Sequence, residues 1–191
     1  VYPQNIVGEV HADGEIIAGR GFWPGLCVSL KHNSMFASFT ILAKGDYPAE
    51  LNIHIPFCLV SNDVANDQLI IHPGYWFRYN MYALERNAWK YVERDRRTDK
   101  IQHIDYDYLA PDTIQEMATA IEYLETLTPD DKDIARVQGF ENAKRTVVIL
   151  KVKDTIRLFK EMIRLHAARC LLHHFSAYQF TSFEAFRQSI P

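Results

Sequence analysis

The feature that most constrains this chain is a change in the spacing of its apolar residues at Pro73-Gly74. Before that dipeptide, short apolar runs alternate with glycine-rich and polar turns, a pattern typical of strands. After it, apolar residues recur at spacings of three and four, which is typical of amphipathic helices. The sequence therefore predicts a β-rich segment over residues 1–74 and an α-helical region over residues 75–191.

The β-rich segment has imperfect hexapeptide character. Val10 and Ile16 lie six residues apart, and residues 51–55 alternate between apolar and polar side chains. A left-handed β-helix needs this spacing, because each coil has three short faces and one residue of each face points inward. The predicted fold class is therefore mixed β then α: a left-handed β-helix-like segment of two or three coils, followed by helices.

The second region contains three candidate helical segments. Residues 75–95 form one amphipathic pattern, and Asp112 is a suitable N-cap residue for another, with Gln115 at the capping-box position. Residues 93–100 between them are mixed in charge and are interpreted as a solvated linker. An unbroken apolar stripe from Val148 to Cys170 predicts one long helix of about 30 residues, roughly 45 Å. Residues 146–152 are β-branched and also suit a strand, but the continuous stripe favours a helix.

Composition narrows the classes of partner. The net charge is -3, so the chain has no positive excess for binding nucleic acid, and no apolar run reaches the length of a membrane span. Three widely spaced cysteines are typical of reduced thiols in a cytoplasmic protein. Aromatic residues make up 13% of the chain, which together with the long helix predicts a homo-oligomer. Because the chain begins with Val rather than Met, we interpret it as part of a longer protein.

Three segments carry a resemblance to a known family: residues 19–25 (GRGFWPG), 32–34 (HNS) and 43–51 (AKGDYPAEL). The chain resembles the C-terminal part of a large bacterial family with hexapeptide repeats, whose members are often labelled glucose-1-phosphate thymidylyltransferases. The resemblance covers most of the chain and implies the C-terminal region of a sugar-phosphate nucleotidyltransferase. The glycine-rich nucleotide loop of such enzymes has no match here, so the nucleotidyl chemistry would belong to residues outside this sequence.

Two histidines are candidate catalytic residues. His32 is the preferred general base, because a histidine on a coil of a hexapeptide acyltransferase accepts a proton near neutral pH. Asn33 is its hydrogen-bonding neighbour, and His54 is the second candidate base. The alternative is that these residues only order turns.

A second polar group suits a phosphorylated ligand. Lys44 supplies charge, Gly45 permits close approach of the backbone, and Asp46 and Tyr47 follow directly. Trp23 and Tyr47 could stack on a sugar ring or a base. The alternatives are an ordinary turn for the first group and core packing for the two aromatic residues.

Three functions stay open at this point. The first is a nucleotidyltransferase region that contacts a sugar phosphate or a nucleotide sugar, and the second is a hexapeptide acyltransferase that uses His32 as its base. The third is a non-catalytic oligomerisation module. The sequence indicates no particular cofactor, and no metal site is predicted, because His166, His173 and His174 lack the spacing of metal ligands.

Overall fold

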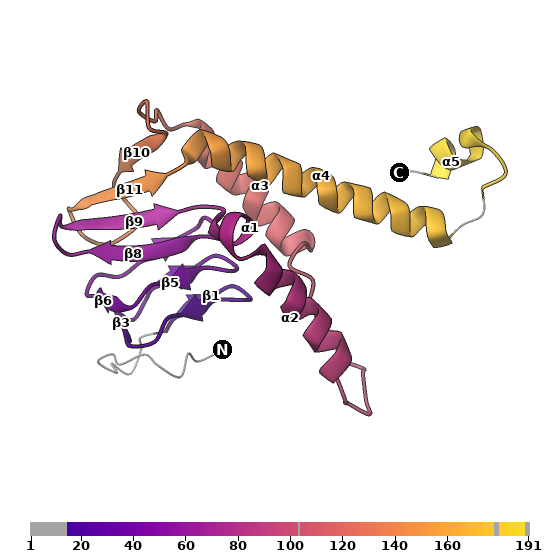
Figure 1. Cartoon of the computed structure of the whole chain (residues 1–191), viewed down its shortest axis with the longest axis horizontal. Helices are drawn as coiled ribbons and strands as arrows, with labels where there is room; N and C mark the ends of the chain where they lie inside the picture. Colours follow the sequence, from indigo (N-terminus) through magenta and orange to yellow (C-terminus); the bar gives the residue numbers. More distant parts are fainter. Residues whose placement is uncertain (1–14, 103, 178–179, 190–191) are drawn as a thin grey trace.

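The N-terminal half of the molecule is built from short parallel strands. The computed structural model describes residues 15–102, 104–177 and 180–189 (Figure 1). The first strands are β1 (Ile17–Ala18), β2 (Trp23–Pro24), β3 (Val28–Leu30), β4 (Met35–Phe36), β5 (Ile41–Leu42), β6 (Gly45–Tyr47), β7 (Asn52–Ile53) and β8 (Leu59–Asp63). They pair in parallel as β1-β4-β7, β2-β5-β8 and β3-β6. We call these three sets the strand stack.

The chain returns to the same face of the strand stack at regular intervals. Ile17 pairs with Met35 and Met35 pairs with Asn52, which are steps of 18 and 17 residues. Inward-facing side chains of successive strands meet in the interior, where Phe36, Leu42 and Ile53 are buried. Burial of these side chains is the main stabilising contribution to strands only two or three residues long.

One corner of the strand stack depends on left-handed backbone conformations. Gly21, Phe39 and Phe57 occupy equivalent positions and have φ angles of 71°, 57° and 56°. The rings of Phe39 and Phe57 stack with their centroids 4.8 Å apart. A Cβ atom on Gly21 would lie 2.5 Å from the Phe39 ring, so only glycine fits at the first of these positions.

The strand stack does not continue as a solenoid. β8 pairs antiparallel with β9 (Gln68–His72), which pairs in parallel with β11 (Thr146–Leu150), and β11 pairs antiparallel with β10 (Ile134–Val137). The result is an open, mixed sheet of six strands in the order β10-β11-β9-β8-β5-β2. Two of these strands come from the region predicted to be helical.

The predicted fold class is therefore wrong. In the described part of the chain there is no closed or solenoid left-handed β-helix, and the region after residue 74 is not all helical. The physical reason lies in residues 146–150, where Val147, Val148 and Ile149 are all buried because both faces of the sheet are covered. A fully buried strand shows no alternation, so its apolar run merged with the helical stripe that follows it. Val10, used for the hexapeptide spacing, lies outside the described residues.

The helices also differ from the predicted segments. The segment over residues 75–95 is divided at Asn80 into α1 (Tyr75–Tyr79) and α2 (Met81–Arg94). Asp112 is not an N-cap residue, because α3 (Pro111–Glu125) begins at Pro111, a residue that suits the first helical position. The helix of about 30 residues starting at Val148 is wrong as well: α4 (Val152–Ala177) begins only after the strand, and α5 (Phe183–Ser189) follows it.

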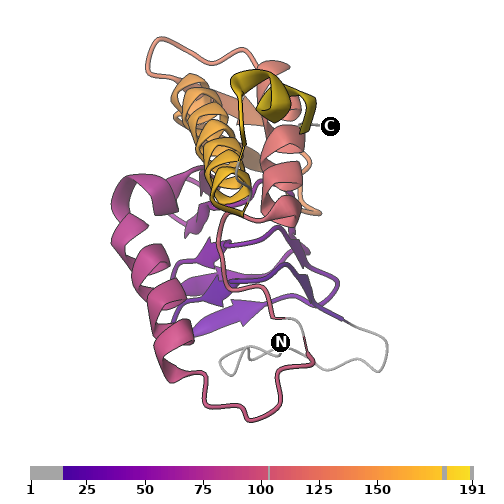
Figure 2. The ribbon, with the colours of Figure 1, turned by 90° about the vertical axis from the view of Figure 1, so that its right-hand side faces the viewer.

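The helices cover the sheet and extend past it. α3 and α4 pack side by side, and the far end of α4 projects from the body of the molecule (Figure 1). α2 lies along the outer edge of the strand stack (Figure 2). Strands and helices share a core that includes Leu69, Met117 and Phe159. Among the described residues, no helix is long and apolar enough to cross a membrane. The division into two folding units, residues 1–74 and 75–191, stays a prediction. The cytoplasmic location also stays a prediction.

Candidate ligand-binding site

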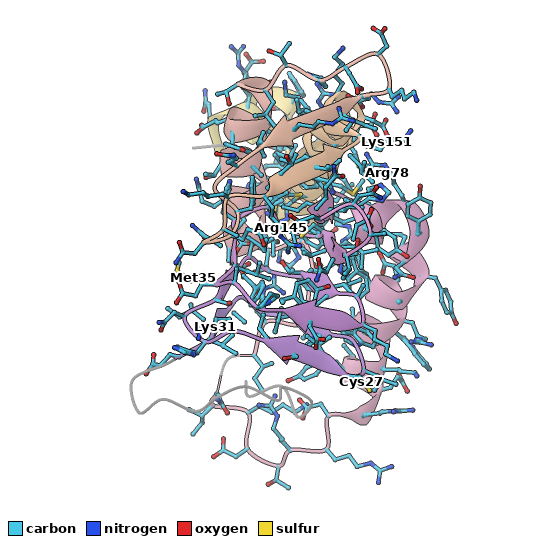
Figure 3. The ribbon with its side chains drawn as sticks, turned by 90° about the vertical axis from the view of Figure 1, so that its left-hand side faces the viewer. Cys27, Lys31, Met35, Arg78, Arg145 and Lys151 are labelled. Atoms are coloured by element: carbon cyan, nitrogen blue, oxygen red, sulfur yellow. The ribbon has the colours of Figure 1, made fainter. Side chains whose placement is uncertain are left out.

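The sequence-predicted polar residues lie at three different corners of the strand stack. His32 and Asn33 form the turn between β3 and β4, Lys44 lies between β5 and β6, and His54 follows β7. Figure 3 shows the first two corners on opposite sides of the strand stack. Lys31, next to His32 in sequence, marks the first corner, and Cys27 marks the second, which it shares with Lys44. The structure therefore does not bring these candidates together into one site.

The two residues of the His32 turn have different surroundings. Asn33 is exposed, has a φ of 62° and donates its backbone N–H to the carbonyl oxygen of Glu15 at 2.8 Å. His32 is half-buried. Asparagine tolerates this left-handed conformation better than most residues, so Asn33 shapes the turn.

Tyr47 and Trp23 occupy contrasting positions. Tyr47 is 1% exposed, and its hydroxyl donates to the carbonyl oxygens of Ala43 (2.9 Å) and Val60 (3.1 Å). Burial raises the pKa of Tyr47 far above its ordinary value. Trp23 is 51% exposed, with its ring centroid 6.0 Å from that of Trp76. Of the two rings, only that of Trp23 is presented to solvent.

His54 is held by aromatic rings. Its imidazole stacks on Phe140 at 4.5 Å between centroids and meets the edge of Tyr123 at 4.8 Å. Burial lowers the pKa of His54 and so favours the neutral ring. A neutral imidazole can accept a proton, and the His54 side chain stays exposed where it contacts α3 and the loop after β10.

A hollow of about 720 Å³ lies elsewhere, at the C-terminal end of α2. Its lining consists of Asn87, Lys90, Tyr91 and Arg94 from α2, and Asp95, Arg96, Arg97 and Ile104 from the following loop. The four residues from α2 are spaced at i, i+3, i+4 and i+7, so they lie on one face of the helix. We call this feature the basic hollow, because four of its eight lining side chains are cationic.

One guanidinium of the basic hollow is rigidly oriented. Arg97 donates from Nε and Nη2 to the two carboxylate oxygens of Asp95, each at 2.8 Å, and from Nη2 to the Tyr91 hydroxyl at 2.8 Å. This pairing lowers the pKa of Asp95 well below its usual range and raises that of Arg97. Arg97 Nη1 is shielded from solvent and finds no hydrogen-bond partner among the described residues.

The other three cations of the basic hollow have no carboxylate partner in the described part of the chain. By contrast, seven other arginines of the described residues form ion pairs with Asp or Glu: Arg20, Arg78, Arg97, Arg136, Arg145, Arg157 and Arg169. Lys90, Arg94 and Arg96 therefore leave a local positive charge on a chain whose net charge is -3. The helix dipole favours cations at a C-terminal end, which explains how the fold tolerates them there.

Sequence reasoning missed the basic hollow because it treated residues 93–100 as a linker of mixed charge. A useful signal was present in the sequence, since Lys90 and Arg94 lie on one face of α2 and Arg96 and Arg97 follow just after the helix. Over the described residues, no group of three or more His, Cys, Asp or Glu side chains could hold a metal ion.

Comparisons with known proteins give little functional guidance. No family model matches this chain, and no solved structure matches it. One curated relative is an uncharacterized protein of Treponema pallidum (strain Nichols), 38% identical over 186 residues. The match covers 85% of this chain and 26% of that protein, so the chain spans about a quarter of the length of the relative.

Proposed function

We propose that this chain binds a phosphate-bearing small molecule of the sugar-phosphate or nucleotide-sugar class in the basic hollow. One observation carries the proposal: Lys90, Arg94 and Arg96 line the hollow without carboxylate partners, beside an Arg97 held in place by Asp95. A phosphate group carries a charge of about -1.5 to -2 near neutral pH and would neutralise such a cluster.

The dimensions and lining suit a ligand larger than free phosphate. The basic hollow measures about 720 Å³ and is open to solvent, so a ligand would rest against its wall rather than be enclosed by it. Guanidinium groups bind phosphate oxygens through two parallel hydrogen bonds. Tyr91 and Ile104 add apolar surface against which a sugar or a base would pack.

This proposal keeps the predicted class of ligand but moves its contacts. The ligand predicted for Lys44, Asp46 and Tyr47 is assigned instead to residues of α2 and of the loop that follows it. The nucleotidyltransferase and acyltransferase activities, and the family resemblance, stay predictions.

Isothermal titration calorimetry of the full chain tests the proposal. The ligands are glucose 1-phosphate, a nucleotide sugar, inorganic phosphate and unphosphorylated glucose. We expect the first two to bind, and we expect binding to weaken as salt concentration rises, because the contacts are ionic. Replacement of Lys90 and Arg94 by Gln should weaken binding at least tenfold, since charge-assisted hydrogen bonds contribute about 1.5–3 kcal/mol each.

Two further variants make the test specific. Lys132→Gln with Lys153→Gln removes the same charge from exposed sites distant in sequence, and should leave the affinity unchanged. Lys44→Gln examines the site predicted from sequence. The proposal fails if neither phosphorylated ligand binds, or if Lys44→Gln abolishes binding while the double variant in the basic hollow does not.

A further inference from the structure

The outward face of α2 exposes large apolar side chains. Tyr82 is 76% exposed, Trp89 is 61% exposed and Val92 is 55% exposed, while Tyr79, at the end of α1, is 59% exposed. Figure 2 shows α2 at the edge of the molecule with no other element on its outer side. Contiguous exposed apolar groups of this kind are typical of interaction sites.

Four residues on this face form a line along the helix, which we call the outer seam: Tyr82, Arg86, Trp89 and Glu93. Their spacings of four, three and four residues are those by which one helix packs against another. The basic hollow lies on a different face of α2, so the two features can act independently.

The outer seam is complementary to itself when a second copy runs antiparallel to it. Trp89 lies three residues after Arg86 and four residues before Glu93. In a pair related by a twofold axis beside Trp89, each Arg86 therefore lies opposite Glu93 of the partner subunit. The two tryptophan rings meet at the axis, which is the arrangement expected of an isologous interface.

Charges on the outer seam are available for such a pairing. The Arg86 side chain is half-buried, has no ion-pair partner among the described residues, and holds its guanidinium 5.7 Å from the centroid of the Tyr82 ring. In the described part of the chain, Glu93 has no ion-pair partner and is exposed. An aromatic centre flanked by opposite charges is the usual composition of a protein interface.

We propose that two copies of this chain associate through antiparallel packing of their α2 helices along the outer seam. The helices overlap over about ten residues, or roughly 15 Å. The two exposed aromatic side chains of the outer seam, Tyr82 and Trp89, supply roughly 200–350 Å² of apolar surface per copy. A standard interface buries about 800 Å² per partner, so the outer seam forms its centre and flanking residues complete it. Ile101, which is 90% exposed, lies in the loop that follows α2.

Sedimentation velocity of the full chain across the micromolar range tests the proposal. We expect a reversible dimer. Trp89→Ala should raise the dimer dissociation constant at least tenfold, because central tryptophans commonly dominate interface energy. Leu26→Ala, at a residue 76% exposed on the strand stack, is the matched control and should change nothing.

A charge exchange identifies the orientation. Arg86→Glu and Glu93→Arg should each weaken the dimer, since each places like charges opposite one another. The variant with both changes should recover most of the affinity. A chain that is monomeric throughout the range, a dimer indifferent to Trp89→Ala, or a double variant weaker than both single variants would overturn the proposal. Circular dichroism of each variant confirms that the fold is retained.

Discussion

Arg145 offers the sharpest test of how the two halves of the chain are joined. It donates from Nε and Nη2 to the Glu141 carboxylate at 2.5 and 2.8 Å, and from Nη1 to Asn62 Oδ1 at 2.7 Å. The side chains of Arg145 and Glu141 are 13% and 1% exposed. Arg145 lies between the strand stack and the β10–β11 hairpin (Figure 3), so it ties the hairpin to β8.

Replacement of Arg145 by Met leaves the Glu141 carboxylate buried without its partner. Breaking one side of a buried pair typically costs about 3–5 kcal/mol, because the remaining charge stays desolvated. For a chain of this size each kcal/mol lowers Tm by about 2–4 °C, so we expect a decrease of roughly 6–20 °C. Changing both Arg145 and Glu141 to Met should recover most of the loss, because apolar side chains need no partner.

Urea unfolding followed by circular dichroism measures this effect as a shift of the midpoint at constant slope. Arg157→Met is the matched control, because Arg157 pairs with Asp154 but is 74% exposed, and it should leave the urea midpoint nearly unchanged. A loss below about 1 kcal/mol for Arg145→Met would refute the reasoning, as would a double variant less stable than the single one.

Two further variants probe the corner of the strand stack and its contact with α3. Gly21→Ala should cost about 1–3 kcal/mol in chemical unfolding, because the new Cβ meets the Phe39 ring at a position of positive φ. Gly139→Ala also has a positive φ, but no described atom lies within 4 Å of its Cβ, so it measures the backbone strain without the clash. Burial raises the pKa of Glu116, so the stability contributed by its protonated form is present at low pH and is lost as pH rises through the folded-state pKa. The free energy of unfolding of Glu116→Gln relative to that of the wild type should therefore increase from about pH 4 to pH 7. Hydrogen bonds from Arg20 lower the pKa of Asp112, so stability is lost as pH falls, and Asp112→Asn should show the opposite trend in the same melts.

The candidate site was only partly accessible from sequence. The family resemblance predicted a sugar-phosphate or nucleotide-sugar ligand, which stays a prediction, and the residues assigned to it lie at separate corners of the strand stack. His54 illustrates the difficulty: alternation with Ile53 and Ile55 correctly placed it outward, but not beside Tyr123 of α3 and Phe140, which come from far along the chain to contact its ring. Long-range packing of this kind leaves no local pattern.

The sequence by itself determined the short strands and turns before Pro73-Gly74 and the amphipathic character of α2, α3 and α4. These depend on local spacing and on glycine at positions such as Gly21, which each segment carries within itself. Only the tertiary structure decided that residues 146–150 form a strand, because β9 and β10 pair with its two edges and Val147, Val148 and Ile149 are buried on both faces. The same holds for the basic hollow, since it exists only where the loop after α2 folds back beside Lys90 and Tyr91.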